Sequence, residues 1–212
     1  MDLLPFDVLV YLLSFVPNRK RNLLSVRLSC KRLLAASKEG FDPSKRRNWA
    51  IKRACEVGYL PSVKEILKDP RVDPTCRENF CLFHCAQEGK AECLKAIMDH
   101  AKVDPSCNES YALRLACTTG NDEVVRVLLR DTRVDPTVCN FNPMLCAISY
   151  DYGAIVNVLL DHDKVKNAGE QDFFTWEAMA MNEPSSLYVL QTHMAKHGMR
   201  IRINKRKNQT IF

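Results

Sequence analysis

VDPT at residues 72–75 is followed by VDPS at 103–106 and by a second VDPT at 134–137, so an Asp-Pro pair returns every 31 residues. Asp42-Pro43 keeps the same spacing. Proline presets φ, and the neighbouring side-chain oxygens can bond nearby amides, so each copy predicts a turn that reverses the chain. A fixed period of this length is typical of a solenoid. Aligned without gaps, the chain divides into five units, the last one degenerate: 43–73, 74–104, 105–135, 136–166 and 167–197.

Each unit predicts a pair of helices. The sixth position offers an N-cap acceptor in four of the five units and predicts the start of the first helix. These positions are Asn48, Asn79, Ser110, Phe141 and Asp172. Further along that helix, two sets of apolar or small residues recur: Ile51, Leu82, Leu113, Met144 and Thr175, then Ala54, Cys85, Ala116, Ala147 and Ala178. Gly58, Gly89 and Gly120 predict left-handed C-caps.

The second helix of each unit carries two apolar positions three residues apart. The first set is Val63, Leu94, Val125, Val156 and Leu187, and the second is Ile66, Ile97, Leu128, Leu159 and Leu190. We expect these stripes to stack into one continuous core, because each unit buries its apolar face against its neighbours.

The units resemble the ankyrin repeat. That family's TPLHxAA segment corresponds here to WAIKRAC (49–55), FCLFHCA (80–86), YALRLAC (111–117) and NPMLCAI (142–148), and only Pro143 keeps the family proline. The resemblance covers residues 43–197 and implies an all-α solenoid with a long, variable surface for partners. Another helical-hairpin solenoid is the alternative, although other helical repeats are longer or lack the reversing loop.

Residues 1–42 obey no period. The run MDLLPFDVLVYLLSFVP (1–17) leaves no polar face around a helical wheel, and a helix of that kind must be covered. It lacks the positive leader and small-residue cleavage pattern of a signal peptide, and it is too short and interrupted to span a bilayer. We therefore expect neither secretion nor membrane insertion, and place the chain in the cytoplasm or the nucleus.

Two short helices predicted around a break at Pro17-Asn18 resemble the F-box. The family's Leu-Pro start, Leu-Leu-Ser helix end and later Leu-Leu, Val-Arg-Leu and Cys-Lys-Arg groups appear here as LP (4–5), LLSFVP (12–17), LL (23–24), VRL (26–28) and CKR (30–32). The resemblance implies an F-box-like helical module over residues 1–40 that docks the Skp-family adaptor of a cullin-RING ubiquitin ligase. The adaptor-binding residues would be Leu4, Pro5, Val8, Leu12, Leu13, Phe15, Leu23, Leu24 and Leu28. The alternative is that these helices only cap the open end of the repeats.

If the repeats bind a substrate protein, its contacts should lie where loops and inner helix faces vary between units while the core positions stay constant. These positions are Arg46, Arg47, Arg53, Arg77, Glu78, His84, Asn108, Glu109, Leu115, Asn140, Phe141 and Tyr150. The combination resembles F-box and ankyrin proteins of large DNA viruses and protists, in which host proteins are the targets. The sequence predicts a substrate receptor with no catalytic residue of its own, while an ankyrin scaffold without a ligase is the alternative function.

The ten cysteines predict free thiols, because several occupy repeat positions as small apolar residues and no secretory leader is present. Cys76, Cys81, His84 and Cys85 lie within ten residues. A structural zinc site also needs a second closely spaced pair of ligands, and no such pair occurs at a suitable distance along the sequence. No base is placed against a thiol for nucleophilic catalysis. We therefore expect no metal, no cofactor and no enzyme activity.

Charge is uneven along the chain. The net charge is +8 over residues 1–55, −8 over 56–194 and +6 over 195–212, which makes 198–212 a basic tail. The stretches SKRRNWAIKR (44–53) and RIRINKRK (200–207) raise nucleic-acid binding as a possibility. A solvated end face, a mobile tail or a nuclear-import segment explains them equally, so we expect a protein partner rather than nucleic acid.

Overall fold

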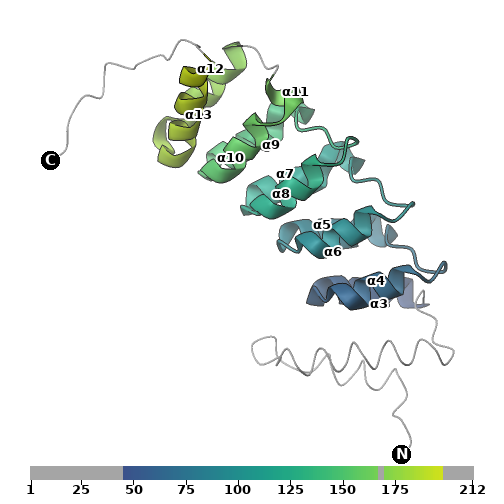
Figure 1. Ribbon diagram of the computed structural model, residues 1–212. Helices are drawn as coiled ribbons and strands as arrows, with labels where there is room; N and C mark the ends of the chain where they lie inside the picture. The colour runs from purple at the N-terminus through teal and green to yellow at the C-terminus, as the bar shows by residue number, and fades with distance from the viewer. Residues whose placement is uncertain (1–44, 167–169, 198–212) are drawn as a thin grey trace, which may run out of the picture. The chain divides into compact units, whose positions relative to one another are not determined.

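The computed structural model describes residues 45–166 and 170–197, and every regular element within them is a helix (Figure 1). These residues fall into two compact units, one ending at Asp104 and one beginning at Pro105. The F-box-like module, with its predicted adaptor-binding residues, and the basic tail lie outside the described residues. The domain boundaries predicted from the sequence therefore stay predictions.

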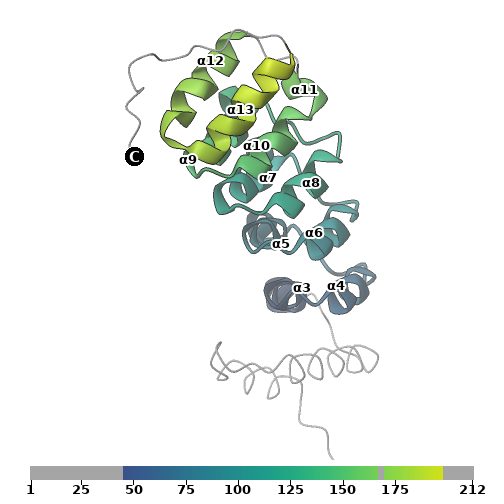
Figure 2. The same cartoon turned by 60° about the vertical axis from the view of Figure 1, so that its left-hand side comes forward.

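The first unit contains two helical pairs. Its helices are α3 (Lys45–Val57), α4 (Leu60–Leu67), α5 (Cys76–Gln87) and α6 (Ala91–Met98). Each first helix packs on the second helix of its own repeat, α3 on α4 and α5 on α6. The like helices also pack on each other, α3 on α5 and α4 on α6, which makes two layers (Figure 2).

The second unit continues the pattern over three repeats. Its helices are α7 (Cys107–Thr119), α8 (Asp122–Leu129), α9 (Val138–Ser149), α10 (Gly153–Leu160), the short α11 (Asp163–Lys166), α12 (Glu170–Met179), the 3₁₀ turn η2 (Ala180–Asn182) and α13 (Pro184–Lys196). The first helices α7, α9 and α12 pack in sequence, and so do the second helices α8, α10 and α13. The predicted helix-turn-helix repeat is confirmed in both units.

The apolar positions predicted from the period form the cores of both units. Ile51, Leu82, Leu113 and Met144 are at most 1 % exposed. On the second helices, Val63, Leu94, Val125 and Val156 are fully buried, as are Ile97, Leu128, Leu159 and Leu190, while Ile66 is half-buried. The cysteines at these positions behave as small apolar residues: Cys55, Cys85 and Cys117 are fully buried free thiols.

The Asp-Pro segments form the predicted turns. Asp73 Oδ1 accepts hydrogen bonds from Thr75 N (3.0 Å) and Thr75 Oγ1 (2.6 Å). Asp135 Oδ1 makes the same pair with Thr137, at 3.0 and 2.9 Å. The hydroxyl of Thr75 is the main reason why the pKa of Asp73 lies below its ordinary value. Each turn is thus held by its own side chains.

The predicted N-cap role of the sixth position is wrong for Asn48 and Ser110. Asn48 and Ser110 do lie at the start of the first helix, but their side chains bond to the next repeat: Asn48 Oδ1 accepts from Asp73 N (2.8 Å) and Ser110 Oγ from Asp135 N (3.2 Å). The reason is backbone geometry. Three consecutive residues, at 77–79, 108–110 and 139–141, have φ between +50° and +64° before the right-handed helix begins.

Left-handed glycines end the first helices, as predicted. Gly58, Gly89 and Gly120 have φ between +70° and +78°, a conformation that costs an L residue free energy. In the fourth repeat Asp151 takes this position with φ +56°. Its carboxylate accepts from Ser186 N (2.8 Å) and Ser185 N (3.3 Å), so it caps the start of α13 in the following repeat.

The gapless alignment is wrong for the first helix of the fifth repeat. Thr175 is exposed, whereas Phe173 and Trp176 are buried two residues earlier than the period predicts. Their rings meet edge to face at a centroid distance of 4.9 Å. The second helix keeps its register, since Leu190 is fully buried. The η2 turn lies between α12 and α13, where the register changes.

Candidate partner-binding surface

Several of the variable positions predicted from the sequence lie at the left-handed turns or on the exposed side of the first helices. In the first unit, Arg77 and Glu78 are exposed at the centre of such a turn, with φ of +53° and +56°. Left-handed backbone is unfavourable for these residue types by about 1–2 kcal/mol each. It directs two long charged side chains into solvent, where a partner protein can reach them.

His84 belongs to a cluster of cations and aromatic rings on the first unit. Its ring stacks on Phe80 at a centroid distance of 5.3 Å, and Lys52 Nζ lies 4.7 Å from the centroid of Phe80. Lys90 Nζ lies 3.5 Å from His84 Nε2 and donates to the carbonyl oxygen of Glu56 (2.7 Å). Burial, with a smaller contribution from Lys90, lowers the pKa of His84. The neutral form of His84 is therefore favoured, and it offers a stacked, half-buried ring.

Of the other predicted residues in α3, the structure describes the side chain of Arg53 but not those of Arg46 and Arg47. Arg53 Nη1 pairs with Glu56 Oε2 at 2.8 Å, and its side chain is 26 % exposed. This i,i+3 pair leaves Arg53 on the helix surface. Arg46 and Arg47 lie at the start of α3, but their side chains are outside the described part of the structure.

In the second unit the turns of two repeats touch. Asn108 and Glu109 are exposed, and the Cys139 thiol in the next turn donates to Glu109 Oε2 at 2.7 Å. That hydrogen bond is the main reason why the pKa of Cys139 lies above its ordinary value. Arg114 Nη2 donates to the carbonyl oxygen of Asn108 (3.3 Å). The two predicted residues thus share one polar surface with Cys139.

The remaining predicted residues of the second unit differ in how far their side chains are exposed. Asn140 and Tyr150 are exposed, and Tyr150 is 56 % exposed beside the ring of Tyr152. Leu115 is half-buried. Phe141 packs edge to face on Trp176 at 5.1 Å, so its ring supports the contact between α9 and α12. Phe141 therefore offers less surface to a partner than its variable position in the sequence indicates.

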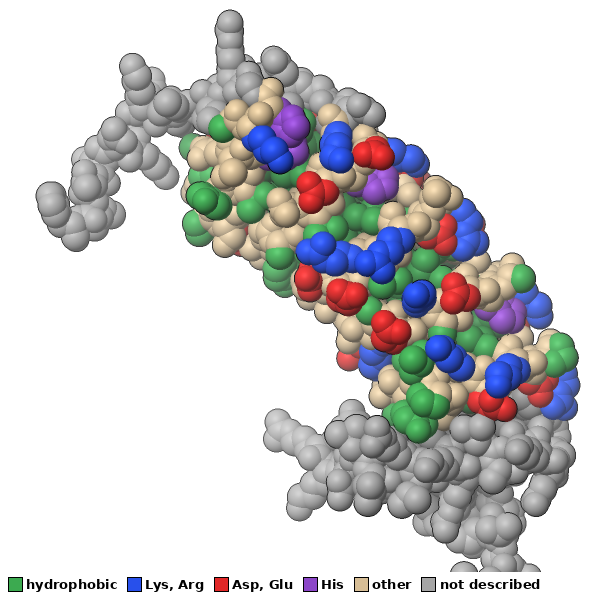
Figure 3. All heavy atoms as spheres, in the orientation of Figure 1, with side chains coloured by type: hydrophobic (Ala, Val, Ile, Leu, Met, Phe, Trp, Pro, Cys, Tyr) green, Lys and Arg blue, Asp and Glu red, His purple; other side chains and the backbone are tan. Residues whose placement is uncertain are grey.

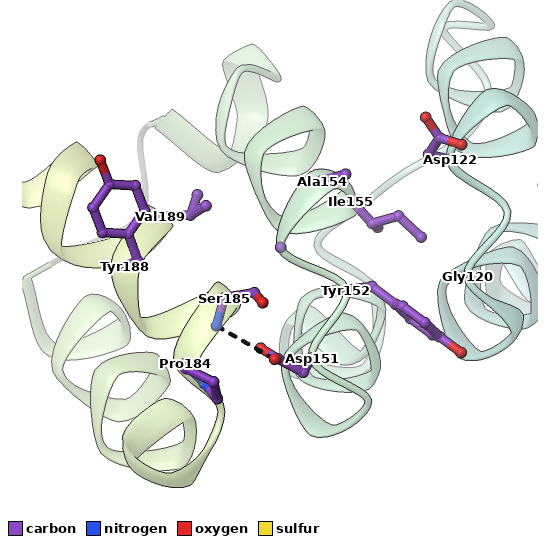
Figure 4. A pocket seen from close by; sticks show the side chains of 11 residues that line it. Gly120, Asp122, Asp151, Tyr152, Ala154, Ile155, Pro184, Ser185, Tyr188 and Val189 are labelled. Atoms are coloured by element: carbon purple, nitrogen blue, oxygen red, sulfur yellow. Dashed lines mark hydrogen bonds between the residues drawn. The ribbon is translucent and has the colours of Figure 1, made fainter.

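A groove at the turns between paired helices was not predicted from the sequence. It has a volume of about 770 Å³ and crosses the starts of α8, α10 and α13 (Figure 4). Tyr152 lies over Gly120 at one end, Tyr188 stands on α13 at the other, and Ile155 and Val189 lie between them. Tyr188 occupies a position held by Asn157, Arg126, Lys95 and Lys64 in the other repeats, and this aromatic residue among polar ones is the signal that could have found the groove.

The cluster of Cys76, Cys81, His84 and Cys85 singled out in the sequence lies within the described residues of the first unit. No group of three His, Cys, Asp or Glu side chains with metal-binding geometry occurs within residues 45–166 and 170–197. Cys55 is hydrogen-bonded with Cys81 and Cys85, and these contacts, together with burial, raise the pKa of its thiol. A protonated, buried thiol is a poor nucleophile and a poor ligand. Cys55, Cys81 and Cys85 therefore act in packing.

Charges of both signs alternate on the face of each unit seen in Figure 3. Arg71 and Asp69 pair at 2.6 Å, and Arg133 and Asp131 repeat the same pair at 2.6 Å in the second unit. None of the described helices is long and apolar enough to cross a membrane.

Comparison with known families agrees with this geometry. The family of ankyrin repeats, in a pattern of three copies, matches residues 49–138 and again residues 82–171, and the two matches together span more than half of the 212 residues. No curated protein matches the chain significantly. Paired helices, the 31-residue period and the family match all lead to the same assignment: the chain belongs to the ankyrin-repeat family.

Proposed function

We propose that this protein is the substrate receptor of a Skp–cullin–F-box ubiquitin ligase, in which residues 1–40 dock the Skp-family adaptor and the repeats hold the target. Ankyrin repeats bind partner proteins, and the first and second units carry the exposed, variable side chains that such binding needs. The F-box-like order of residues 4–32 supplies the link to the ligase. The chain itself contributes binding and no catalysis.

The observation that carries the binding role is the run of left-handed turns. Side chains at 77–79, 108–110 and 139–141 are held in an unfavourable backbone conformation at the same place in successive repeats. Core packing does not require exposed side chains such as Arg77, Asn108 and Asn140 at these turns. These exposed side chains are held by the turns and differ from repeat to repeat. They are therefore suited to specific recognition of a partner protein.

The ligase role is tested by changing Leu4, Leu12 and Leu13 together to Asp. If residues 1–40 dock an adaptor, the variant loses co-purification with the Skp-family adaptor, while the helical circular dichroism and melting temperature of the repeats stay as in the parent. If these helices only cap the repeats, the parent binds no adaptor and the variant melts at a lower temperature. The second result would leave an ankyrin scaffold with no ligase link.

The target-binding role is tested separately by a pull-down from cells. Chains with and without residues 1–40 should capture the same target, and only the intact chain should capture the adaptor. Changing Arg77 and Asn140 to Ala should reduce the captured target without affecting the adaptor. As a control, Arg133→Ala removes an exposed arginine outside these turns and should change neither.

A further inference from the structure

The last repeat exposes an unusual amount of apolar surface. Tyr188 is 72 % exposed, Met179 43 % and Met181 41 %, and all three belong to the fifth repeat. A terminal repeat usually presents a polar outer side, because nothing follows to bury it. Tyr188 also forms one end of the groove across α8, α10 and α13 (Figure 4). Tyr188 and the groove beside it therefore have the character of a docking site.

The groove favours a positively charged occupant. Asp122 and Asp151 line it, and none of its lining residues is Lys or Arg; the exposed Glu123 follows Asp122 in the sequence. Each helix start contributes only roughly half a positive charge, so the two lining carboxylates still outweigh the three helix starts. Arg126 Nε lies 4.0 Å from the carboxylate of Asp122, a separation at which an exposed pair contributes little. Both tyrosine rings can also face a cation.

A segment of matching chemistry follows α13 in the same chain. In MRIRINKRK (199–207), Met199, Ile201 and Ile203 alternate with Arg200 and Arg202, and a basic cluster follows. Strict alternation places the apolar side chains on one face of an extended segment and the arginines on the other. Such a segment matches a groove that has both aliphatic and acidic walls.

The lengths agree as well. Tyr188 lies nine residues before His197, or about 14 Å back along the helix. An extended chain advances about 3.3 Å per residue, so residues 201–203, starting from His197, reach about 13–20 Å. Asp122 is two helix spacings further across, about 20 Å, and together with the roughly 14 Å along the helix this places it about 24 Å from His197. Lys205 and Lys207 reach about 26–33 Å along an extended chain.

On the face of α13 that carries Tyr188, small side chains lie between Tyr188 and His197. Thr192 and Ala195 are exposed and follow Tyr188 at helical spacing, so small side chains lie along the path.

We propose that residues 199–207 fold back along α13 into this groove, with Ile201 and Ile203 against Tyr188 and Val189 and with Lys205 or Lys207 at Asp122. The proposal does not depend on the ligase role. It makes the groove a binding site for a segment of the same chain.

Zero-length cross-linking of the full chain with a carbodiimide tests the contact. At low micromolar concentration, the monomer band should contain a peptide pair that joins Lys205 or Lys207 to Asp122 or Glu123. The double variant D122N/E123Q should lose this product. The control D163N removes a carboxylate whose side chain is 94 % exposed outside the groove and should leave the product unchanged.

A second measurement does not depend on the acidic side chains. Tyr188→Ala removes an exposed ring, so it should leave the fold intact while speeding tryptic cleavage after Arg202 about two- to fivefold, the range expected for losing one exposed contact. Salt at 0.5 M should speed it as well. If no tail lysine cross-links to the groove in the monomer and Tyr188→Ala cleaves at the parent rate, the proposal is wrong. Cross-links found only in a dimer band would overturn it in favour of a second copy.

Discussion

Replacing Gly120 with Ala should destabilise the second unit far more than the equivalent Gly58→Ala destabilises the first. Both glycines are left-handed, with φ of +78° and +74°. A Cβ on Gly120 would lie 2.7 Å from Cζ and 2.8 Å from Cε1 of Tyr152. A Cβ on Gly58 would meet only the flexible side chain of Lys90, at 3.0 Å from Cδ. The two substitutions therefore introduce the same backbone strain. They differ in the side chain that the new Cβ meets, which is the ring of Tyr152 at Gly120 and the flexible Lys90 at Gly58.

The expected magnitudes follow from these two contributions. An L residue in the left-handed region costs about 1–2 kcal/mol, and Ala regains about 0.4–1 kcal/mol by restricting the unfolded chain. Forcing an extra carbon against a packed ring adds about 1–3 kcal/mol. We expect Gly120→Ala to lower the free energy of unfolding by about 2–4 kcal/mol. Gly58→Ala should cost about 1 kcal/mol, because Lys90 can move aside.

Urea unfolding followed by the fluorescence of Trp176 reports on the second unit, in a Trp49→Phe background that removes the other tryptophan. Urea unfolding of the Gly58→Ala variant is followed by circular dichroism. The double variant Gly120→Ala/Tyr152→Ala should recover at least about 1 kcal/mol of the cost, since the ring is then absent. Equal costs for the two glycines, or simple additivity in the double variant, would refute the argument from the ring.

Three further outcomes are expected. Leu128→Ala, at a fully buried position, should cost about 2–5 kcal/mol in urea unfolding, and a cost within about 0.5 kcal/mol would mean that the repeat register is wrong. Asn48→Ala should cost about 1–2 kcal/mol, because it leaves the amide of Asp73 without its acceptor, whereas Asn48→Asp should keep most of that stability. The pKa of Asp73 is lowered from 3.8 by its Thr75 hydrogen bonds, so its contribution is complete above the unfolded value and disappears as pH falls through the folded value. The urea midpoint should therefore fall on acidification below about pH 4, and Asp73→Asn, which cannot titrate, should flatten this dependence.

Much of the candidate site could be predicted because variable positions and repeat spacing are visible in the chain. Arg77, Glu78, Asn108, Glu109, Asn140 and Tyr150 are exposed where the pattern predicted accessible residues. Phe141 was predicted on the same grounds, yet its ring packs on Trp176, 35 residues away. The groove was not predicted at all, because its walls come from three repeats and no single repeat contains it.

The sequence alone determined the 31-residue period, the Asp-Pro turns, the left-handed glycines and nearly all of the buried positions. These features are local or periodic, so turn chemistry and helical spacing suffice to predict them. Only the tertiary structure decided that Asn48 and Ser110 bond to the next repeat, that Asp151 caps α13, and that α12 is shifted by two residues. Each of these depends on groups brought together by packing between repeats, which a pattern read along one chain does not contain.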